Sequence, residues 1–149
     1  MCLTRTHSVA ETEAAGESFA RSVQPGWVIG LSGDLGAGKT AFVRGFARGL
    51  GSPARVHSPT FALLNEYEGG RLRLFHLDLY RLNSAEEVRS AGLENYVTQP
   101  DGVSVVEWIE RWCGDAQTIE GTGPSSFRRI YLRTVDEQVR EIAYDNAGA

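Results

Sequence analysis

Lysine is almost absent from this sequence. Its 149 residues include 15 lysine and arginine side chains, and Lys39 is the only lysine among them. Arginine carries its charge on a broad planar fork, whereas lysine carries it on a slim ammonium at the end of a flexible stem. We therefore expect position 39 to need a slim cation that arginine cannot replace.

Cysteines and long apolar segments are also scarce. Cys2 and Cys113 lack the spacing of a metal site, and two ordinary thiols are typical of a reduced, cytoplasmic setting. No apolar run approaches the length of about 20 residues that spans a bilayer, and the first residues lack the apolar core of a signal peptide. We therefore expect a cytoplasmic protein with no membrane partner.

Basic charge is not in excess either. The formal net charge is −4 at pH 7, and the sequence pI is about 5.4. Because a protein that binds nucleic acid by itself normally presents a basic surface, this balance disfavours strong direct contact with nucleic acid. The length and the hydrophobic content of 42% suit a single domain that spans residues 1–149 and has a real core.

Residues 33–40, with the sequence GDLGAGKT, are the most informative segment that is present. They match the P-loop pattern G-x-x-x-x-G-K-[ST], in which backbone N–H groups surround phosphates, the lysine contacts the terminal phosphates and the hydroxyl binds Mg²⁺. A strand-like run at 27–31 precedes the loop, and residues 41–50, apolar at helical spacing, follow it. The segment therefore predicts that Lys39 and Thr40 bind a nucleoside triphosphate and Mg²⁺.

The remaining segments alternate between helical and extended patterns. Helices are predicted at 8–23 and 84–97, each with a capping box, with short helical turns at 109–113. Strands are predicted at 61–67 and 71–82 as one hairpin, at 102–108, and as a second hairpin that turns near Asp136 and Glu137. Residues 114–126 read as a loop. The fold expected is a single-domain α/β P-loop NTPase fold, with a mixed central β-sheet flanked by helices.

Asp78 is a candidate second ligand for Mg²⁺, which prefers hard oxygen donors. It lies in the apolar run FHLDLY near the end of a predicted strand, where a metal ion would compensate its charge. The alternative is a carboxylate on an exposed edge strand, paired with Arg73 or Arg81.

Glu107 ends a run of apolar residues and is a candidate for polarising the attacking water. The alternative is a strand-terminal glutamate that faces solvent. Thr60, in HSPTF, is placed to reach Mg²⁺ or the γ-phosphate as mobile switch loops do, although Ser-Pro-Thr is also a common turn. His57 and His76 read as structural residues, because nothing in the sequence pairs with them.

The segments GDLGAGKT, RGFARGLG, SPTF, HLDLYRL, GLENY and VEW, in this order, resemble the TsaE (YjeE) family of small bacterial P-loop ATPases. The resemblance spans residues 11–112. It implies a protein that binds ATP and Mg²⁺ and helps to make threonylcarbamoyladenosine at position 37 of tRNAs that read codons beginning with A. It also implies work with the TsaB and TsaD proteins, which would provide the contacts to tRNA. ATP is also favoured over GTP because no Asn/Thr-Lys-x-Asp segment exists.

The resemblance implies site residues as well. Those implied to touch the nucleotide are Gly33, Asp34, Leu35, Gly36, Ala37, Gly38, Lys39, Thr40, Ala41 and Trp108. Those implied to act in catalysis are Lys39, Thr60, Asp78 and Glu107, and the implied Mg²⁺ ligands are Thr40, Asp78 and Glu107. The sequence departs from the family at Ile109, where a proline is usual, and this departure affects the loop behind Glu107.

Two other functions use the same motif. A small P-loop kinase acting on a small molecule would need an acceptor pocket and usually an arginine-rich lid, and no lid-like segment is visible. A nucleotide-gated scaffold without turnover would keep Lys39 but would not need Glu107.

Overall fold

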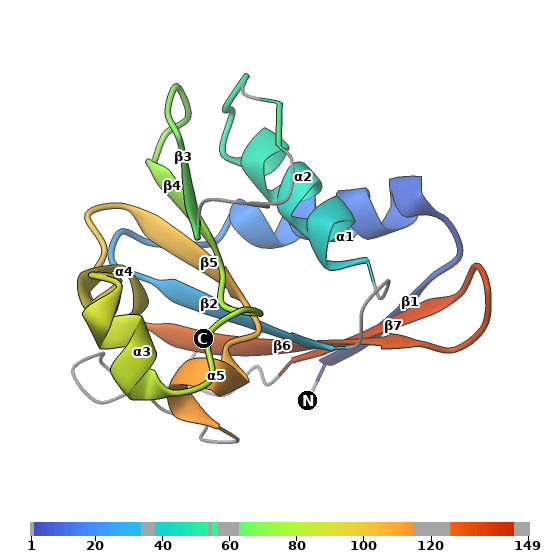
Figure 1. Cartoon of the computed structure of the whole chain (residues 1–149). Coiled ribbons are helices and arrows are strands. Elements are labelled where there is room, and N and C mark those ends of the chain that lie inside the picture. The colour runs from blue at the N-terminus through green and yellow to red at the C-terminus, as the bar shows by residue number, and fades with distance from the viewer. Residues whose placement is uncertain (1, 34–37, 54, 57–62, 115–125, 145–149) are drawn as a thin grey trace.

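A mixed β-sheet runs through the middle of the computed structural model, which describes residues 2–33, 38–53, 55–56, 63–114 and 126–144 (Figure 1). Within these residues the sheet has seven strands in the order β1-β7-β6-β2-β5-β4-β3. The neighbours among β6, β2, β5 and β4 are parallel, and the outer pairs are antiparallel. The strands are β1 (Cys2–Thr6), β2 (Val28–Gly33), β3 (Leu64–Tyr67), β4 (Leu74–Asp78), β5 (Val103–Glu107), β6 (Phe127–Thr134) and β7 (Arg140–Tyr144).

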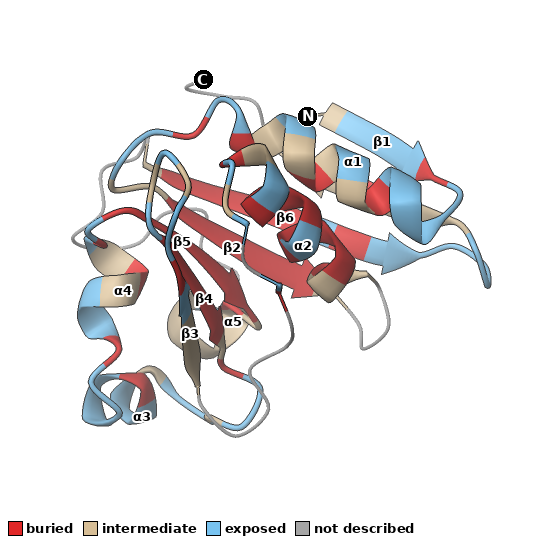
Figure 2. Ribbon diagram, turned by 90° about the horizontal axis from the view of Figure 1, so that it is seen from above, coloured by how far each residue is buried: buried red, intermediate tan, exposed pale blue. Residues whose placement is uncertain are grey.

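Helices cover both faces of this sheet. α1 (Val9–Ala20) and α2 (Lys39–Gly49) lie on one face, as Figure 2 shows. α3 (Ala85–Ser90), α4 (Glu94–Thr98) and α5 (Glu110–Cys113) belong to the other face. Because successive side chains of a strand point to opposite faces, β4 sends Leu74 into the cluster under α2 and Phe75 into the cluster under α3 and α4. The mixed sheet flanked by helices is the architecture that the sequence predicts.

Serine caps start two of the helices. Ser8 Oγ accepts from the Glu11 N–H at 3.1 Å, and Ser84 Oγ accepts from the Glu87 N–H at 3.2 Å. The Glu11 and Glu87 carboxylates accept in turn from the backbone N–H of the residue before each cap. Both predicted capping serines are therefore confirmed, and each satisfies an amide that a helix start leaves unpaired.

The predicted helix at 84–97 is wrong as a single helix. It is divided into α3 and α4, because Gly92 adopts a φ of +79° in the left-handed region, which no helix continues through. The predicted helix at 8–23 ends earlier, at Ala20. β1 was not expected at all, and it completes one edge of the sheet by pairing with β7. Both predicted hairpins are confirmed as antiparallel pairs, β3 with β4 and β6 with β7.

α1 and α2 pack with their backbones in contact, and glycines make this possible. A Cβ on Gly16 would lie 2.1 Å from the carbonyl oxygen of Phe42, and a Cβ on Gly45 would lie 1.7 Å from that of Glu13. At the outer side of the same interface, Arg48 pairs with Glu13 and Glu17. We refer to this glycine-mediated contact as the α1–α2 contact. None of the helices in the described part of the chain is long and apolar enough to cross a membrane.

Replacing Gly45 by alanine tests the α1–α2 contact. Alanine favours a helix over glycine by about 1 kcal/mol, but here its methyl group would force the two backbones apart. We expect Gly45→Ala to lower the free energy of unfolding by about 2 kcal/mol net, as overpacked sites do, in a urea titration. Arg44→Ala, on the exposed side of the same helix, should change it by no more than about 0.5 kcal/mol. A stabilised Gly45→Ala protein would contradict the close packing.

Candidate functional site

Three of the predicted site residues, Gly33, Asp78 and Glu107, lie where parallel strands end. β2 ends at Gly33, directly before the P-loop residues, and Leu31 on β2 is paired with Glu107 on β5. Glu107 is paired on its other side with Asp78 on β4. The carboxyl ends of parallel strands are where α/β sheets bind ligands. The strand order therefore places both carboxylates beside the P-loop, although they are distant from it in sequence.

The two carboxylates also share the face that α2 covers. Along β4, Leu74, His76 and Asp78 alternate with residues of the opposite cluster, and Leu74 belongs to the core under α1 and α2. Along β5, Val105 packs in the same core, two residues before Glu107. This face of the sheet is therefore apolar in its middle and becomes polar and acidic at the end next to the P-loop.

Lys39 is the first residue of α2 and is almost fully buried, with 5% of its surface exposed. Its Nζ donates to the carbonyl oxygen of Gly33 at 2.6 Å and lies 4.1 Å from the centre of the Trp108 ring. A cation over an aromatic face is favourable. The lone lysine is therefore held at the base of the P-loop between β2 and the residue that follows β5.

The start of α2 differs from the serine-capped starts of α1 and α3. Its N-cap is Gly38, which adopts a φ of +95° and provides no side-chain oxygen to the first turn. The first amides of a helix have no partner within the helix and carry partial positive charge. An uncapped helix start that follows a glycine loop fits a phosphate group, which would accept from these amides.

Glu107 is buried rather than exposed to solvent, so the alternative of a solvent-facing glutamate is wrong. It is 4% exposed, and its Oε2 lies 2.6 Å from Nε2 of His76, which is fully buried. Within the described residues, Nδ1 of His76 has no hydrogen-bond partner. The sequence alone indicates no partner for His76. The available signal was its spacing of two from Asp78, which places both on one face of β4.

Asp78 ends β4, which lies between β3 and β5. The alternative that Asp78 lies on an exposed edge strand is therefore wrong. Arg73 pairs instead with Glu66, Glu68 and Asp101. Burial raises the pKa of Asp78, and the charge of Glu107 raises it further. The hydrogen bond that Asp78 accepts from the Tyr80 N–H and the charges of His76 and Lys39 lower the pKa, but the net shift is upward. A half-buried carboxylate under these conditions gains from a nearby cation.

Trp108 and Ile109 form the turn that follows β5. Trp108 adopts a φ of +59°, which is uncommon for a non-glycine residue. The centre of its ring lies 5.1 Å from the centre of the Tyr80 ring. Ile109 is fully buried, and its side chain occupies the space above Gly30, where a Cβ would lie 2.7 Å from Cγ1 of Ile109. Its N–H donates to the Leu31 carbonyl at 3.4 Å, a bond that proline cannot make. Ile109 thus ties this turn to β2.

The remaining predicted site residues divide into two groups. Thr40 is half-buried and Ala41 is buried, and both lie in the first turn of α2. Thr60 and residues 34–37 lie outside the described residues. Among the described residues no group of three or more His, Cys, Asp or Glu side chains is arranged to hold a metal ion. Any Mg²⁺ here would instead combine Thr40 and Asp78 with oxygens of the ligand, which is how this ion is usually bound beside phosphates.

Comparison with known proteins adds to this geometry. The family model described as threonylcarbamoyl adenosine biosynthesis protein TsaE matches residues 6–142. The chain belongs to the TsaE family. Relatives named "tRNA threonylcarbamoyladenosine biosynthesis protein TsaE" include one from Bacillus subtilis, 40% identical, over 97% of this chain and 85% of the relative. Another, from Treponema pallidum, is 44% identical over 95% of this chain and 96% of the relative.

A solved structure supports the same family assignment. The crystal structure of YdiB from Bacillus subtilis superposes with a TM-score of 0.72 at 34% identity, covering 96% of this chain and 83% of that one. The resemblance inferred from the short motifs is therefore confirmed, and so is the P-loop NTPase fold. The roles of the individual site residues stay predictions.

The raised pKa of Asp78 leads to a test in the absence of Mg²⁺. Because its pKa is raised, Asp78 in the folded state keeps its proton at pH values above the ordinary aspartate pKa of 3.8. Folding therefore loses stability as pH rises from 3.8 through the raised pKa, and the loss remains at neutral pH. Asp78→Asn removes that cost and keeps an oxygen for the Tyr80 N–H. We expect this variant to melt above the wild-type protein at pH 7 and level with it near pH 3.

Asp101→Asn, whose side chain is fully exposed, is the matched control and should not shift the melting temperature at either pH. An Asp78→Asn protein that melts below the wild type at pH 7 would mean that the carboxylate stabilises the fold, contrary to this interpretation.

Proposed function

We propose that this TsaE-family chain is an ATP-binding and ATP-hydrolysing subunit that depends on Mg²⁺ and on partner proteins. It supports the formation of threonylcarbamoyladenosine in tRNAs that read codons beginning with A. The observation that carries the proposal is one arrangement: the only lysine is buried at an uncapped helix start, beside two carboxylates at the ends of neighbouring strands.

The phosphates are assigned to the P-loop. Residues 33–40 would surround them with backbone N–H groups, and the start of α2 adds the positive end of its dipole. Lys39 now donates to the Gly33 carbonyl. A phosphate oxygen is a better acceptor for this ammonium, because a charge-assisted hydrogen bond is stronger than one to a neutral carbonyl.

Mg²⁺ is assigned to Thr40 and Asp78. Burial and the neighbouring charge of Glu107 raise the pKa of Asp78, and a divalent cation bound there would offset both effects. When bound, this ion would neutralise charge on the phosphate oxygens. Glu107 is a further candidate, through the carboxylate oxygen that His76 does not use.

Glu107 is proposed to orient and polarise the water that attacks the terminal phosphate. Its contact with His76 at 2.6 Å holds the carboxylate in place, and both groups are buried. Thr60 is proposed to close over the phosphates in the manner of a switch loop. A water-activating residue acts in the transition state, so its loss should reduce turnover more than ATP binding.

The partners proposed are TsaB and TsaD, and contact with tRNA is assigned to them. The net charge of −4 supports this division, since a subunit that gripped tRNA by itself would need a basic surface. A slow reaction of the isolated chain is expected, because an open site excludes water poorly until another surface covers it.

Lys39→Ala should abolish most ATP binding, because the phosphates lose their charge-assisted partner at the base of the loop. Lys39→Arg should also bind poorly, since the guanidinium is too broad for a buried position where the residue is only 5% exposed. Arg48→Ala, an exposed change in the last turn of α2, should bind as the wild-type protein does. Titration calorimetry with ATP and Mg²⁺ measures all three, and full affinity in Lys39→Ala would disprove the P-loop assignment.

Glu107→Gln keeps a hydrogen-bonding partner for His76 but removes the negative charge. We expect ATP affinity within about threefold of the wild type and phosphate release slower by about 100-fold or more, a typical loss for a general base. TsaB and TsaD should change the wild-type rate without restoring the variant. Glu94→Gln, an exposed substitution on α4, serves as the control. Wild-type turnover in Glu107→Gln would show that Glu107 takes no part in the mechanism. A wild-type rate that TsaB and TsaD leave unchanged would contradict the proposed dependence on these partners.

A further inference from the structure

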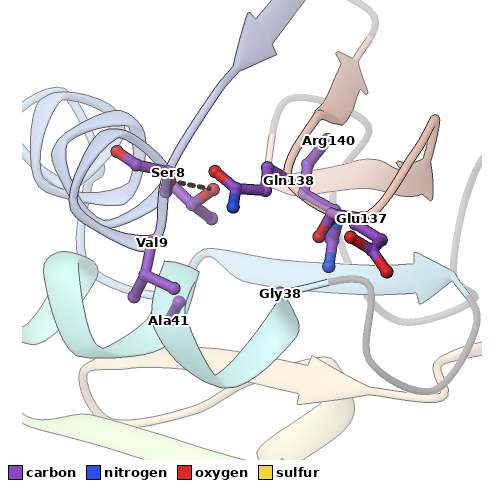
Figure 3. Close-up of a pocket in the computed structure, with 8 residues that line it drawn as sticks. Ser8, Val9, Gly38, Ala41, Glu137, Gln138 and Arg140 are labelled. Carbon is purple, nitrogen blue, oxygen red and sulfur yellow. Dashed lines mark hydrogen bonds between the residues drawn. The ribbon is translucent and has the colours of Figure 1, made fainter.

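Two arginines lie near the P-loop, one on each side of β2 in the sheet. On the β6 side, a cavity of about 420 Å³ lies beside the P-loop, between the starts of α1 and α2 and the β6–β7 hairpin, and Gly38 and Arg140 help to line it (Figure 3). Arg140 donates to the carbonyls of Asp136 and Glu137, so it holds the hairpin turn. On the β5 side, the turn that follows β5 leads into α5, which carries Arg111.

Arg111 is joined to the P-loop lysine through one aromatic ring. Its N–H donates to the Trp108 carbonyl at 3.0 Å, and its guanidinium carbon lies 5.5 Å from the centre of the Trp108 ring. Nζ of Lys39 lies 4.1 Å from the centre of the same ring. Both distances are within the range of a cation over an aromatic face. Two positive charges therefore lie against one indole ring, next to the end of the strand that carries Glu107.

The Arg111 side chain lacks an anionic partner. Within the described residues it makes no hydrogen bond and no ion pair, and its Nε is buried and unpaired. Arg129, by contrast, donates to the Gly114 carbonyl at 2.6 Å. Arg89, which also lies over a tryptophan, pairs with Glu94. A half-buried guanidinium without a partner loses hydration that nothing replaces, so the surroundings of Arg111 favour the arrival of an anion.

Hydrolysis of ATP develops negative charge that a second cation would stabilise. The water oxygen forms a bond to the terminal phosphorus while the bond from that phosphorus to the bridging oxygen breaks. The bridging oxygen keeps the electron pair and leaves with ADP, and the water proton passes toward Glu107. Lys39 is one positive charge, whereas Asp78 and Glu107 bring two carboxylates to the same edge of the sheet. Sites of this kind commonly add an arginine, from the same chain or from a partner.

We propose that Arg111 is the arginine that stabilises the charge developing on the terminal phosphoryl group, and that this chain supplies it without a partner. Trp108 is its positioning residue, because the ring holds the guanidinium near Lys39. The inference rests on the proposed hydrolysis of ATP and adds a residue to that reaction. A cation with this role acts mainly in the transition state, so its loss should affect ground-state nucleotide binding little.

The test compares ADP alone with ADP plus aluminium fluoride, both with Mg²⁺, in titration calorimetry of the full chain. Aluminium fluoride beside ADP mimics the phosphoryl group in transfer, so the affinity gained from it reports transition-state stabilisation without turnover. Arg111→Gln removes the charge and keeps a planar polar group for the Trp108 ring. We expect this variant to bind ADP within about threefold of the wild type and to lose about tenfold or more of the gain from aluminium fluoride.

Two further variants serve as controls. Arg111→Lys keeps the charge and should recover part of the gain. Arg89→Gln changes another arginine over a tryptophan, 4.9 Å from the centre of the Trp112 ring, and should leave the gain unchanged.

A full gain from aluminium fluoride in Arg111→Gln would overturn the inference. Equal weakening of ADP with and without aluminium fluoride would also overturn it, because Arg111 would then act only in the ground state. So would a wild-type protein that binds ADP but gains nothing from aluminium fluoride, since a cation of the chain itself needs no partner. A wild-type protein that binds neither ATP nor ADP would refute the proposed function as well.

Discussion

The pairing of β2 with β5, and of β5 with β4, is the constraint on which the site depends. This register sets Leu31 opposite Glu107 and Glu107 opposite Asp78, so three segments spread over the chain end at one edge of the sheet. A slip of one residue would turn both carboxylates to the opposite face, because side chains alternate along a strand. The apolar residues that precede them, packed under α1 and α2, fix the register and thereby fix the acidic pair.

The acidic edge is an energetic liability in the free protein. A half-buried Asp78 beside a buried Glu107 gains from nearby positive charge, which Lys39 provides, while His76 is in contact with Glu107. The same buried lysine lies over Trp108. The fold thus keeps a set of mutually compensating polar groups in a low-dielectric place, where each is held firmly because leaving it unpaired costs free energy.

The sequence predicts the parts of this structure that depend on local chemistry. The P-loop, the serine caps and the two hairpins are predicted from glycines, capping residues and alternation within short segments. The caps and hairpins are present, and the P-loop lies between the expected strand and helix. The contact of His76 with Glu107 and the cavity behind Gly38 depend on which distant segments become neighbours, which periodicity does not specify. β1 escaped notice because its five residues are paired only at a sheet edge, and the break at Gly92 because one glycine is often tolerated within a helix.

The α1–α2 contact has a consequence for how sequences of this kind can vary. Where two backbones touch, a side chain added to either helix needs space that only the other helix can yield, so positions 16 and 45 each accept a larger residue only if the helices move apart. Both helices also contribute walls to the cavity beside the P-loop. The helical walls of that cavity therefore tolerate few larger side chains, and changes in what the cavity accommodates are easier at residues 135–138 of the β6–β7 turn, which are exposed.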